Sequence, residues 1–275
     1  MSALDSVRGV ARDLRESGVP SPRVDAEFLV GHVLGLSRSE LYATDRELTE
    51  IELTRLRELV ERRRAREPLA YVLGEWGFRR LTLEVDRRVL IPRPETEVLV
   101  ERCLERVRGL AEPRILDVGA GSGAIALAIA DEHPGARILA VERLVNALAV
   151  ARRNLRRAGV DGRVELRRAD LLAEIAGPFD LVVSNPPYVS PEEYESLQPE
   201  IRLYEPREAL VGVGVGAEIA REARRVLERG GWLALECGDG QAGDLAAELE
   251  GLGYRDVRKT RDLAGRDRIV EGRWA

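Results

Sequence analysis

The chain has 275 residues, and its 44% hydrophobic content is ample for a core in one large domain or in two. Its 43 basic and 48 acidic side chains leave a net charge of −5. The first 75 residues carry 12 basic and 14 acidic groups, so neither part of the chain has the basic excess of a protein that binds nucleic acid through phosphate neutralisation alone. No stretch approaches about 18 apolar residues and no apolar signal core opens the chain, so we expect a cytoplasmic protein without a membrane segment.

Cysteine and histidine are scarce. The two cysteines, Cys103 and Cys237, are too few for a disulfide framework or a cysteine-based zinc site. His32 and His133 are the only histidines, which argues against histidine-dependent catalysis and histidine-rich metal sites. We therefore expect no metal centre.

Residues 1–73 alternate apolar and charged side chains at helical spacing, with no strand pattern before about Tyr71. Ser21-Pro22 indicates a helix start, and Gly18 and Gly35 indicate helix ends. A third, long amphipathic helix is predicted over residues 49–67. Its inward-facing side chains are predicted to be Ile51, Leu53, Leu56, Leu59 and Val60. The pattern predicts a small helical domain over residues 1–73.

The apolar period changes towards two between residues 74 and 90. The side chains that alternate with polar neighbours there are Trp76, Phe78, Leu81, Leu83 and Val85. This pattern predicts a β-hairpin that links two domains. Pro92 and Pro94 then stiffen the chain before a helix predicted over about residues 96–109. Spacing alone favours an ordinary helix start for these prolines over a rigid wall beside a ligand.

From residue 114 onwards, strand and helix patterns alternate. Strands are predicted over residues 114–118, 137–141, 164–168, 179–184 and 232–236, with two closing strands near 256–260 and 268–271. Helices are predicted over residues 124–131, 145–158, 217–229 and 242–252. Repeated β-α units predict a doubly wound, mostly parallel seven-stranded α/β sheet over residues 91–275. The glycine- and valine-rich stretch 211–216 is predicted to be a loop.

A glycine-rich loop follows the first strand of this sheet. Its residues are Gly119, Ala120, Gly121, Ser122 and Gly123. Glycines let the backbone turn sharply and approach a ligand, and the helix start that follows offers free N–H groups. The spacing is not the Gly-x-Gly-x-x-Gly run of dinucleotide sites, so these glycines alone are weak evidence.

Acids follow the next two strands. Glu142 ends the second strand, where a carboxylate can accept hydrogen bonds from both hydroxyls of a ribose. Asp170 follows the third strand, beside the expected base, where it can accept from an exocyclic amine. Leu171 next to it is predicted to pack on the face of the ring. The alternative for Glu142 is an ordinary charged strand end.

Asn185-Pro186-Pro187-Tyr188 ends the fourth strand of the sheet. Two prolines cannot continue a strand, because they supply no N–H donors, so the turn is rigid. It leaves an amide, a carbonyl and an aromatic ring at the edge where open α/β sheets bind ligands. The alternative is a strand terminator with a packed tyrosine.

Together, Asp117-x-Gly119-x-Gly121-x-Gly123, the acid after the second strand and the Asn-Pro-Pro-Tyr turn resemble the class I S-adenosylmethionine-dependent methyltransferases. Within them the turn is similar to that of enzymes that methylate amino groups of adenine, cytosine or glutamine. An amide nitrogen is a poor nucleophile because its lone pair is delocalised. The Asn185 side-chain oxygen and the Pro186 carbonyl can each accept one of its N–H bonds, while Tyr188 stacks on the planar group; this is catalysis by positioning and local electrostatics.

Over nearly its whole length the chain also resembles the PrmC/HemK family of peptide chain release factor glutamine methyltransferases. The segments that carry this resemblance are residues 74–78, 90–97, 116–123, 185–189, 205–210 and 262–268, among them Pro-Arg-Pro-Glu-Thr-Glu and Asp-Leu-Ala-Gly-Arg-Asp-Arg. Glu142 stands where the family usually has Asp, and Leu171 where some members have an aromatic residue. Residues 211–217 replace the usual Gly-Gly-x-Asp-Gly-Leu stretch.

The resemblance implies methylation of the glutamine side-chain amide in the Gly-Gly-Gln loop of class I release factors, with S-adenosylmethionine as the methyl donor. It implies that residues 1–73 help to dock this protein partner. It also implies that Gly119 to Gly123, Glu142, Leu171 and Asn185 contact the cofactor, and that Asn185, Pro186, Pro187 and Tyr188 hold the glutamine. No direct nucleic-acid binding is expected.

Two other functions remain open. An adenine-N6 methyltransferase acting on DNA or RNA would flip a base into the pocket, which usually demands a basic strand-binding surface that the acidic composition disfavours. A non-catalytic, cofactor-binding adaptor of translation factors would not need the Asn-Pro-Pro-Tyr geometry.

Overall fold

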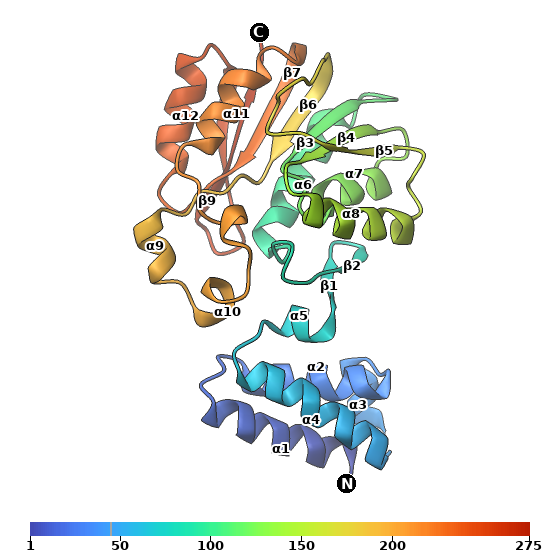
Figure 1. The fold of residues 1–275 in the computed structure, drawn as a ribbon. Helices are drawn as coiled ribbons and strands as arrows, with labels where there is room; N and C mark the ends of the chain where they lie inside the picture. Colours follow the sequence, from blue (N-terminus) through green and yellow to red (C-terminus); the bar gives the residue numbers. More distant parts are fainter. Residues whose placement is uncertain (45) are drawn as a thin grey trace. The chain divides into compact units, whose positions relative to one another are not determined.

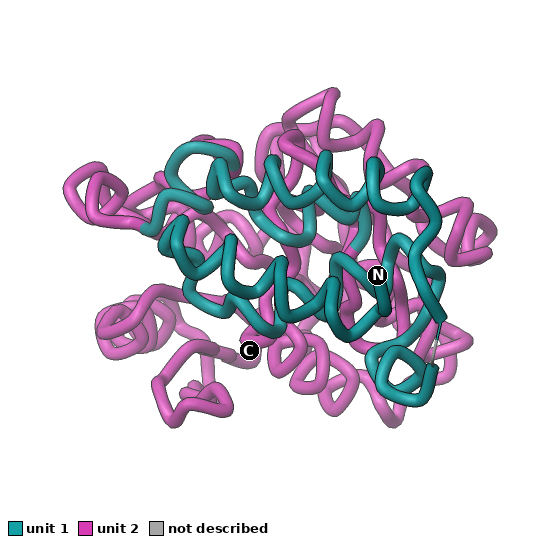
Figure 2. Tube along the Cα trace, turned by 90° about the horizontal axis from the view of Figure 1, so that it is seen from below, with its two compact units in different colours: residues 1–75, 198–204 teal, residues 76–197, 205–275 magenta. Residues whose placement is uncertain are grey.

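The computed structural model describes residues 1–44 and 46–275, which form two compact units (Figures 1 and 2). Unit 1 comprises Met1–Glu75 together with Gln198–Tyr204, and unit 2 comprises Trp76–Leu197 and Glu205–Ala275. Unit 1 therefore includes a short segment that begins 14 residues after the end of the fourth strand of the sheet, Ser184. The sequence pattern changes from helical to alternating strand and helix only once along the chain. It therefore does not reveal that residues 198–204 belong to unit 1.

Unit 1 is built from helices. They are α1 (Ala3–Glu16), α2 (Pro22–Leu34), α3 (Arg38–Ala43), α4 (Glu50–Arg64), α5 (Leu69–Leu73) and the later α10 (Pro199–Arg202). Its core is one apolar cluster, to which α1, α2 and α4 each contribute a buried stripe. The predicted starts and ends at Ser21-Pro22 and Gly35 are confirmed, since α2 begins at Pro22 and Gly35 caps it in the left-handed conformation.

Two details of unit 1 differ from the expectation. The predicted inward position of Ile51 is wrong, because its surface is 83% exposed. The buried stripe of α4 runs through Leu56, Leu59, Val60 and Arg63, and Ile51 lies on the opposite side of the first turn. The short helices α3 and α5 were not expected from periodicity, which is a weak signal over five or six residues.

The Gln198–Tyr204 segment is tied to unit 1 by buried ion pairs. Glu200 binds Arg63 at 3.0 Å and Arg66 at 2.6 Å, and the Tyr204 hydroxyl donates to the Ala65 carbonyl at 2.6 Å. Arg63 also binds Asp25 of α2 at 2.7 Å. Because Arg63 and both of its carboxylate partners are buried, this network is a structural centre of unit 1.

The predicted hairpin is present as a two-stranded sheet of β1 (Glu75–Phe78) and β2 (Leu81–Glu84). Phe78 and Leu83 are buried, as the alternating pattern predicts. The Glu84 N–H donates to the Asn154 side chain at 2.7 Å, which fixes the end of β2 to the helix over residues 145–158.

Unit 2 contains a seven-stranded sheet in the order β5-β4-β3-β6-β7-β9-β8. The strands are β3 (Arg114–Val118), β4 (Arg137–Glu142), β5 (Val164–Arg168), β6 (Phe179–Ser184), β7 (Leu227–Glu236), β8 (Arg255–Arg261) and β9 (Asp267–Arg273). The first five are parallel, whereas β9 runs antiparallel to both β7 and β8. The doubly wound, mostly parallel seven-stranded sheet is thus confirmed.

Helices cover both faces of this sheet (Figure 1). On one face lie α6 (Pro94–Val107), α7 (Ala124–Glu132) and α8 (Val145–Ala158), and on the other lie α11 (Val215–Ala223) and α12 (Ala242–Gly251). Alternate residues of each strand enter the two cores, so that Ile115 packs with the first group and Leu116 with the second. The short helices α9 (Pro191–Glu195) and η1 (Arg207–Ala209) lie in the connection after β6.

The helix predicted over residues 217–229 is wrong at both ends. Gly214 caps α11 from a left-handed conformation (φ 83°), so the helix begins at Val215, inside the stretch predicted to be a loop. The helix ends at Ala223 because the residues that follow pair with strand β6 of the sheet. The Phe179 N–H donates to the Val226 carbonyl at 2.8 Å, and Leu227 pairs with Phe179. Sheet pairing outweighs local helix propensity here.

Candidate active site

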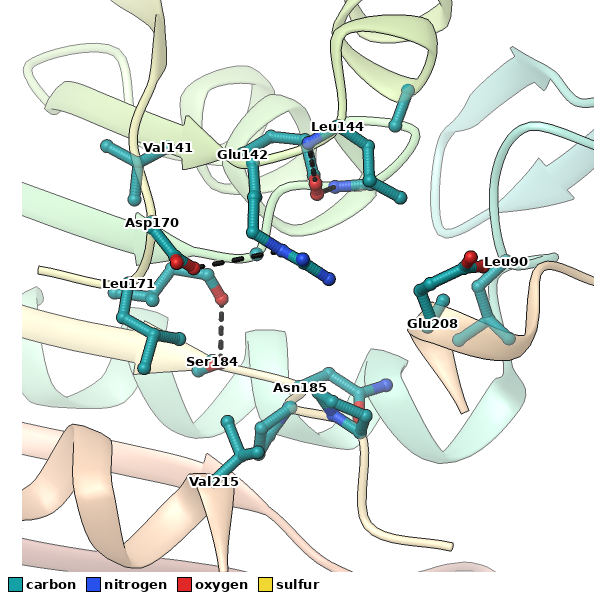
Figure 3. A pocket seen from close by; sticks show the side chains of 18 of the residues that line it. Leu90, Val141, Glu142, Leu144, Asp170, Leu171, Ser184, Asn185, Glu208 and Val215 are labelled. Carbon is teal, nitrogen blue, oxygen red and sulfur yellow. Dashed lines mark hydrogen bonds and ion pairs between the residues drawn. The ribbon is translucent and has the colours of Figure 1, made fainter. Parts of the chain in front are cut away.

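A large cavity lies at the carboxyl ends of the parallel strands in unit 2, where doubly wound sheets bind ligands. It encloses about 790 Å³ of space, a figure that includes its open mouth. Figure 3 shows Glu142 and Leu144 facing Asn185 and Val215 across it. The predicted site residues that line it are Gly119, Gly121, Glu142, Asp170, Leu171, Asn185, Pro186 and Pro187.

A smaller cavity adjoins it. It is lined by the other side of the glycine loop, with Ala120 and Ser122, and by Pro92, Arg93 and Thr96. Asn185 lines both cavities. Of the two prolines that spacing assigned to a helix start, Pro92 therefore also forms part of the wall beside the site.

The glycine loop is held in a conformation that only glycine adopts freely. Gly119, Gly121 and Gly123 have φ values of 81°, 54° and 86°. A Cβ on Gly119 would meet no protein atom within 4 Å, whereas one on Gly123 would lie 3.1 Å from the Leu127 side chain. Gly119 thus presents bare backbone to the cavity, while Gly123 serves the packing of α7 against the loop.

The Glu142 carboxylate joins two parts of the site. One oxygen accepts from the Gly121 N–H at 3.0 Å and the other from the Leu144 N–H at 2.8 Å. Each carboxylate oxygen has a second lone pair, so both remain able to accept from ligand hydroxyls. The structure therefore gives Glu142 a local role that the strand-end pattern did not reveal, alongside its place in the cavity wall.

Asp170 and Leu171 line the cavity next to each other. The Asp170 side chain is 72% exposed and pairs loosely with Arg143 at 3.7 Å. Leu171 has a φ of 47°, in the left-handed region that a leucine rarely adopts. Strained residues of this kind cluster at ligand sites, because the surrounding structure must hold them in place.

The Asn-Pro-Pro-Tyr turn is anchored on both sides. The Ser184 hydroxyl donates to the Val118 carbonyl at 2.6 Å, which ties the end of β6 to β3. The Gln241 side chain donates to the Tyr188 carbonyl at 3.0 Å and accepts from the Gly238 N–H at 3.0 Å. The turn is therefore fixed by hydrogen bonds as well as by its prolines.

Tyr188 follows the two prolines of the turn and lies beside Glu236. Neither cavity has Tyr188 among its described lining residues. Its hydroxyl points to the Glu236 carboxylate at 3.4 Å, and burial raises the pKa of this phenol.

Thr96 and Glu236 are site residues that sequence reasoning missed. The Asn185 amide nitrogen donates to the Thr96 hydroxyl at 3.1 Å, and this hydroxyl donates to Glu236 at 2.7 Å. Thr96 lies inside the Pro-Arg-Pro-Glu-Thr-Glu segment, which the sequence analysis singled out without assigning a role to this threonine. Glu236 ends an apolar strand beside β6, where an acid is unusual enough to have been noticed.

Segments far apart in the sequence meet around this turn. Arg93 binds Glu205 at 2.5 Å, and Glu205 also accepts from the Ile91 N–H at 3.2 Å. At the start of α6, Glu95 pairs at 3.3 Å with Arg266 of the carboxy-terminal segment. The segments that carry the family resemblance therefore support one region of unit 2.

Two buried acids near the site have strongly raised pKa values. Burial raises the pKa of Asp117 to about 7, and the nearby Glu142 charge adds to the shift. Burial likewise raises the pKa of Glu236 to about 7, opposed by the hydrogen bond from Thr96. Perturbed acids of this kind are a mark of functional sites.

The strand order with its antiparallel β9, the glycine loop and the Asn-Pro-Pro-Tyr turn define a class I S-adenosylmethionine-dependent methyltransferase. The fold is shared with the catalytic domain of hMettl16 in complex with an RNA hairpin (TM-score 0.54, 17% identity, 82% of each chain). It is also shared with the Thermus thermophilus 16S rRNA N2 G1207 methyltransferase (TM-score 0.53, 18% identity, 73% of this chain and 50% of that one). At these identities the likeness concerns the fold alone.

Closer relatives identify the family. The model of the PrmC N-terminal domain matches residues 6–74, and that of the methyltransferase small domain matches residues 94–202. The release factor glutamine methyltransferase of Geobacter sulfurreducens is 43% identical, over 98% of this chain and 95% of the relative. That of Deinococcus radiodurans is 41% identical over 100% and 99%, respectively. The chain belongs to the release factor glutamine methyltransferase family.

The cavity fits the cofactor of this class. The bare backbone at Gly119 leaves room for a ligand, Glu142 retains lone pairs for hydroxyls, and the strained Leu171 presents an apolar side chain. Among the described residues we find no cluster of acids, cysteines and histidines suited to a metal ion. Nor does any helix in the described part of the chain have the length and apolarity to cross a membrane.

Proposed function

We propose that this protein transfers a methyl group from S-adenosylmethionine to the side-chain amide nitrogen of the glutamine in the Gly-Gly-Gln loop of class I peptide chain release factors. Family membership over the whole chain supports this substrate. One structural observation carries the chemistry: the Asn185 amide nitrogen is bound to Thr96, and its side-chain oxygen remains for a ligand at the cavity wall.

The cofactor residues that we propose surround the large and small cavities. Gly119 to Gly123 supply the loop that approaches the ligand. Gly119 and Gly121 line the large cavity, and Ala120 and Ser122 line the small one. Gly123 is the N-cap of α7. Glu142 accepts the ribose hydroxyls, Asp170 accepts from the exocyclic amine of the base, and Leu171 packs on the ring. Asn185 completes the wall.

S-adenosylmethionine supplies an electrophilic methyl group when bound. Asn185 and Pro186 then act on the glutamine: the Asn185 oxygen and the Pro186 carbonyl each accept one N–H of its amide. This orients the nitrogen and favours a less planar, more nucleophilic geometry. Pro187 fills the wall beside it. Tyr188 stacks on the amide plane, with its hydroxyl directed at Glu236.

Residues 1–73 form the greater part of unit 1, and we propose that they dock the release factor. The partner is then recognised as a folded protein rather than as a peptide, and the protein works in the cytoplasm, where translation factors act. No nucleic acid is required. The balanced charge of the chain supports this, since phosphate binding usually needs a basic surface.

The test is incubation of the protein with methyl-labelled S-adenosylmethionine and three candidate acceptors: a whole release factor, DNA and RNA. Label on the release factor, located by mass spectrometry at the Gly-Gly-Gln glutamine, is the expected result. A release factor with this glutamine replaced by alanine is the matched control and stays unlabelled. Label on nucleic acid alone would instead establish an adenine-N6 methyltransferase, and no label at all a non-catalytic adaptor.

Docking by residues 1–73 is tested in the same assay. We expect the whole release factor to be methylated far better than a short peptide that contains Gly-Gly-Gln. Equal activity on both would contradict a docking role.

A further inference from the structure

The Asn185 side chain is useful only in one of its two orientations. An amide end carries one acceptor and one NH2 donor, and a glutamine NH2 group can be held only by the acceptor. If the amide turned over, two NH2 groups would face each other. Something must therefore decide which atom of Asn185 faces the cavity.

Hydrogen-bond accounting shows what decides it. A hydroxyl has one hydrogen to donate, and an ionised carboxylate can only accept. While Glu236 is ionised, Thr96 must therefore give its hydrogen to Glu236, at 2.7 Å, and can only accept from its other neighbour. That neighbour is Asn185 at 3.1 Å, so the Asn185 nitrogen is obliged to face Thr96 and the oxygen is obliged to face away.

The three groups come from separate elements that meet at the sheet edge. Asn185 follows β6, Glu236 ends the adjacent parallel strand β7, and Thr96 lies in the first turn of α6. Thr96 and Glu236 are only 4% and 1% exposed, so the bond between them is shielded from water.

Burying the Glu236 carboxylate costs free energy that packing alone does not require. In the described part of the chain its carboxylate accepts from Thr96 and, at a longer 3.4 Å, from Tyr188. Arg268 of β9 is the cation that acts on it, and Glu95 of α6 repels it. A buried carboxylate this sparsely compensated is costly, and a neutral amide would fill the same space at lower cost.

We propose that Thr96 and Glu236 are positioning residues that fix the direction of the Asn185 amide, through a one-way chain of hydrogen bonds from Asn185 to Thr96 to Glu236. Glu236 lines neither cavity, and Thr96 lines only the smaller one. The inference rests on the proposed function for its effect on methyl transfer, but the orientation of Asn185 can be measured without any substrate.

Three variants test the proposal. Thr96→Val keeps the side-chain shape and removes the hydroxyl, and we expect kcat on the release factor to fall roughly 10- to 100-fold, the usual cost of a misplaced reacting group. KM for S-adenosylmethionine should change less than kcat. Thr96→Ser restores the hydroxyl and should recover most of the activity. Thr82→Val, at an exposed threonine of β2, is the matched control.

A double variant separates positioning from stability. Thr96→Val leaves Glu236 buried without its closest donor, so part of its effect could be loss of folding. Combining it with Glu236→Gln removes the stranded charge, and we expect the thermal midpoint to recover while kcat stays low. Recovery of kcat together with the midpoint would overturn the proposal.

The side-chain NH2 signals of Asn185 in an NMR spectrum give a readout that does not depend on catalysis. They should shift and exchange faster in Thr96→Val. The signals of Asn154, whose amide donates to the Ser122 carbonyl at 2.9 Å, should not change. If Asn185 responds but the wild-type protein methylates no release factor, the proposed function fails and the positioning chain stands. If the wild-type protein is active and Thr96→Val alters neither signal nor kcat, the positioning chain is refuted.

Discussion

The Glu142 carboxylate accepts the Gly121 N–H at 3.0 Å, so the acid that ends β4 also holds the glycine loop that follows β3. The backbone supports the same junction, because the N–H groups of Gly119 and Ala120 both donate to the Val141 carbonyl at 2.9 Å. The glycine loop and Glu142, two parts of the proposed cofactor site that were predicted separately from sequence, are thus one hydrogen-bonded unit.

Glu142→Ala should therefore weaken S-adenosylmethionine binding in two ways, through loss of the proposed ribose acceptor and through release of Gly121. Hydrogen bonds to a charged group contribute about 1.5–3 kcal/mol each, so we expect Kd to rise at least roughly 10-fold. Isothermal titration calorimetry measures this. Glu165→Ala, at an acid of β5 that pairs with Arg167 and lines neither cavity of the site, is the control and should leave Kd unchanged. An unaltered Kd in Glu142→Ala would remove Glu142 from the cofactor site.

Gly119 and Gly159 offer a matched pair for testing the glycine loop. Both have positive φ values, 81° and 67°, and a Cβ on either would meet no protein atom within 4 Å. Alanine at either position should cost about 1–2 kcal/mol of unfolding free energy through backbone strain. Only Gly119 lines the cavity, so only Gly119→Ala should weaken S-adenosylmethionine binding as well. Equal affinities for the two variants would contradict a cofactor that approaches this backbone.

Asn185→Ala should lower kcat by roughly 10²- to 10³-fold, the usual effect of removing one hydrogen-bonding group aimed at a reacting atom. Single-turnover methylation of the whole release factor measures this. Binding of S-adenosylmethionine should be retained in large part, because the glycine loop and Glu142 remain. Full methyl transfer by Asn185→Ala would refute the proposed mechanism.

The raised pKa of Glu236 predicts a dependence on pH. Only the ionised carboxylate forces Thr96 to accept from Asn185, so kcat should rise with pH through about 7. Tyr188, Arg268 and Glu95 also act on this carboxylate. In Glu236→Gln this inflection should disappear. The Asp117 pKa of about 7 is present in both proteins, so a persisting inflection would assign the transition to Asp117.

The same shift has a consequence for stability, with the opposite direction. A folded-state pKa of about 7, against 4.5 for the free group, means that the folded protein binds the Glu236 proton more tightly than the unfolded chain. This contribution is complete below pH 4.5 and is lost as pH rises through about 7; at 1.36 kcal/mol per pH unit it amounts to about 3 kcal/mol. Urea denaturation should show Glu236→Gln gaining stability relative to wild type between these pH values.

The buried Arg63 network should dominate the stability of unit 1. Arg63→Met keeps the bulk of the side chain but leaves Asp25 without its partner at 2.7 Å and removes one of the two cations on Glu200. Breaking a buried pair in this way costs about 3–5 kcal/mol. Thermal unfolding and faster hydrogen exchange at residues 198–204 should report the loss. Arg12→Met, at an exposed arginine paired at 3.9 Å with Asp13, should have little effect.

Many strands and helices of this protein, and part of its candidate site, could be predicted from the sequence alone. Apolar runs and period-3.6 patterns predicted β3, β5, β6 and α8 with their observed bounds, because buried strands and amphipathic helices depend on the local distribution of apolar residues. The Asn-Pro-Pro-Tyr turn and the glycine loop were likewise visible, since proline and glycine restrict or free the backbone wherever they occur.

Only the tertiary structure decided which residues complete the site. Thr96, Asn185 and Glu236 are separated by 89 and 51 positions in the sequence, and they meet because α6 packs beside the ends of two parallel strands. The end of α11 was decided in the same way, by pairing of Leu227 with Phe179. Local spacing carries no information about such contacts, because they depend on which strands become neighbours in the sheet. The direction of the Asn185 amide is thus a property of the fold, although Asn185 itself was evident in the sequence.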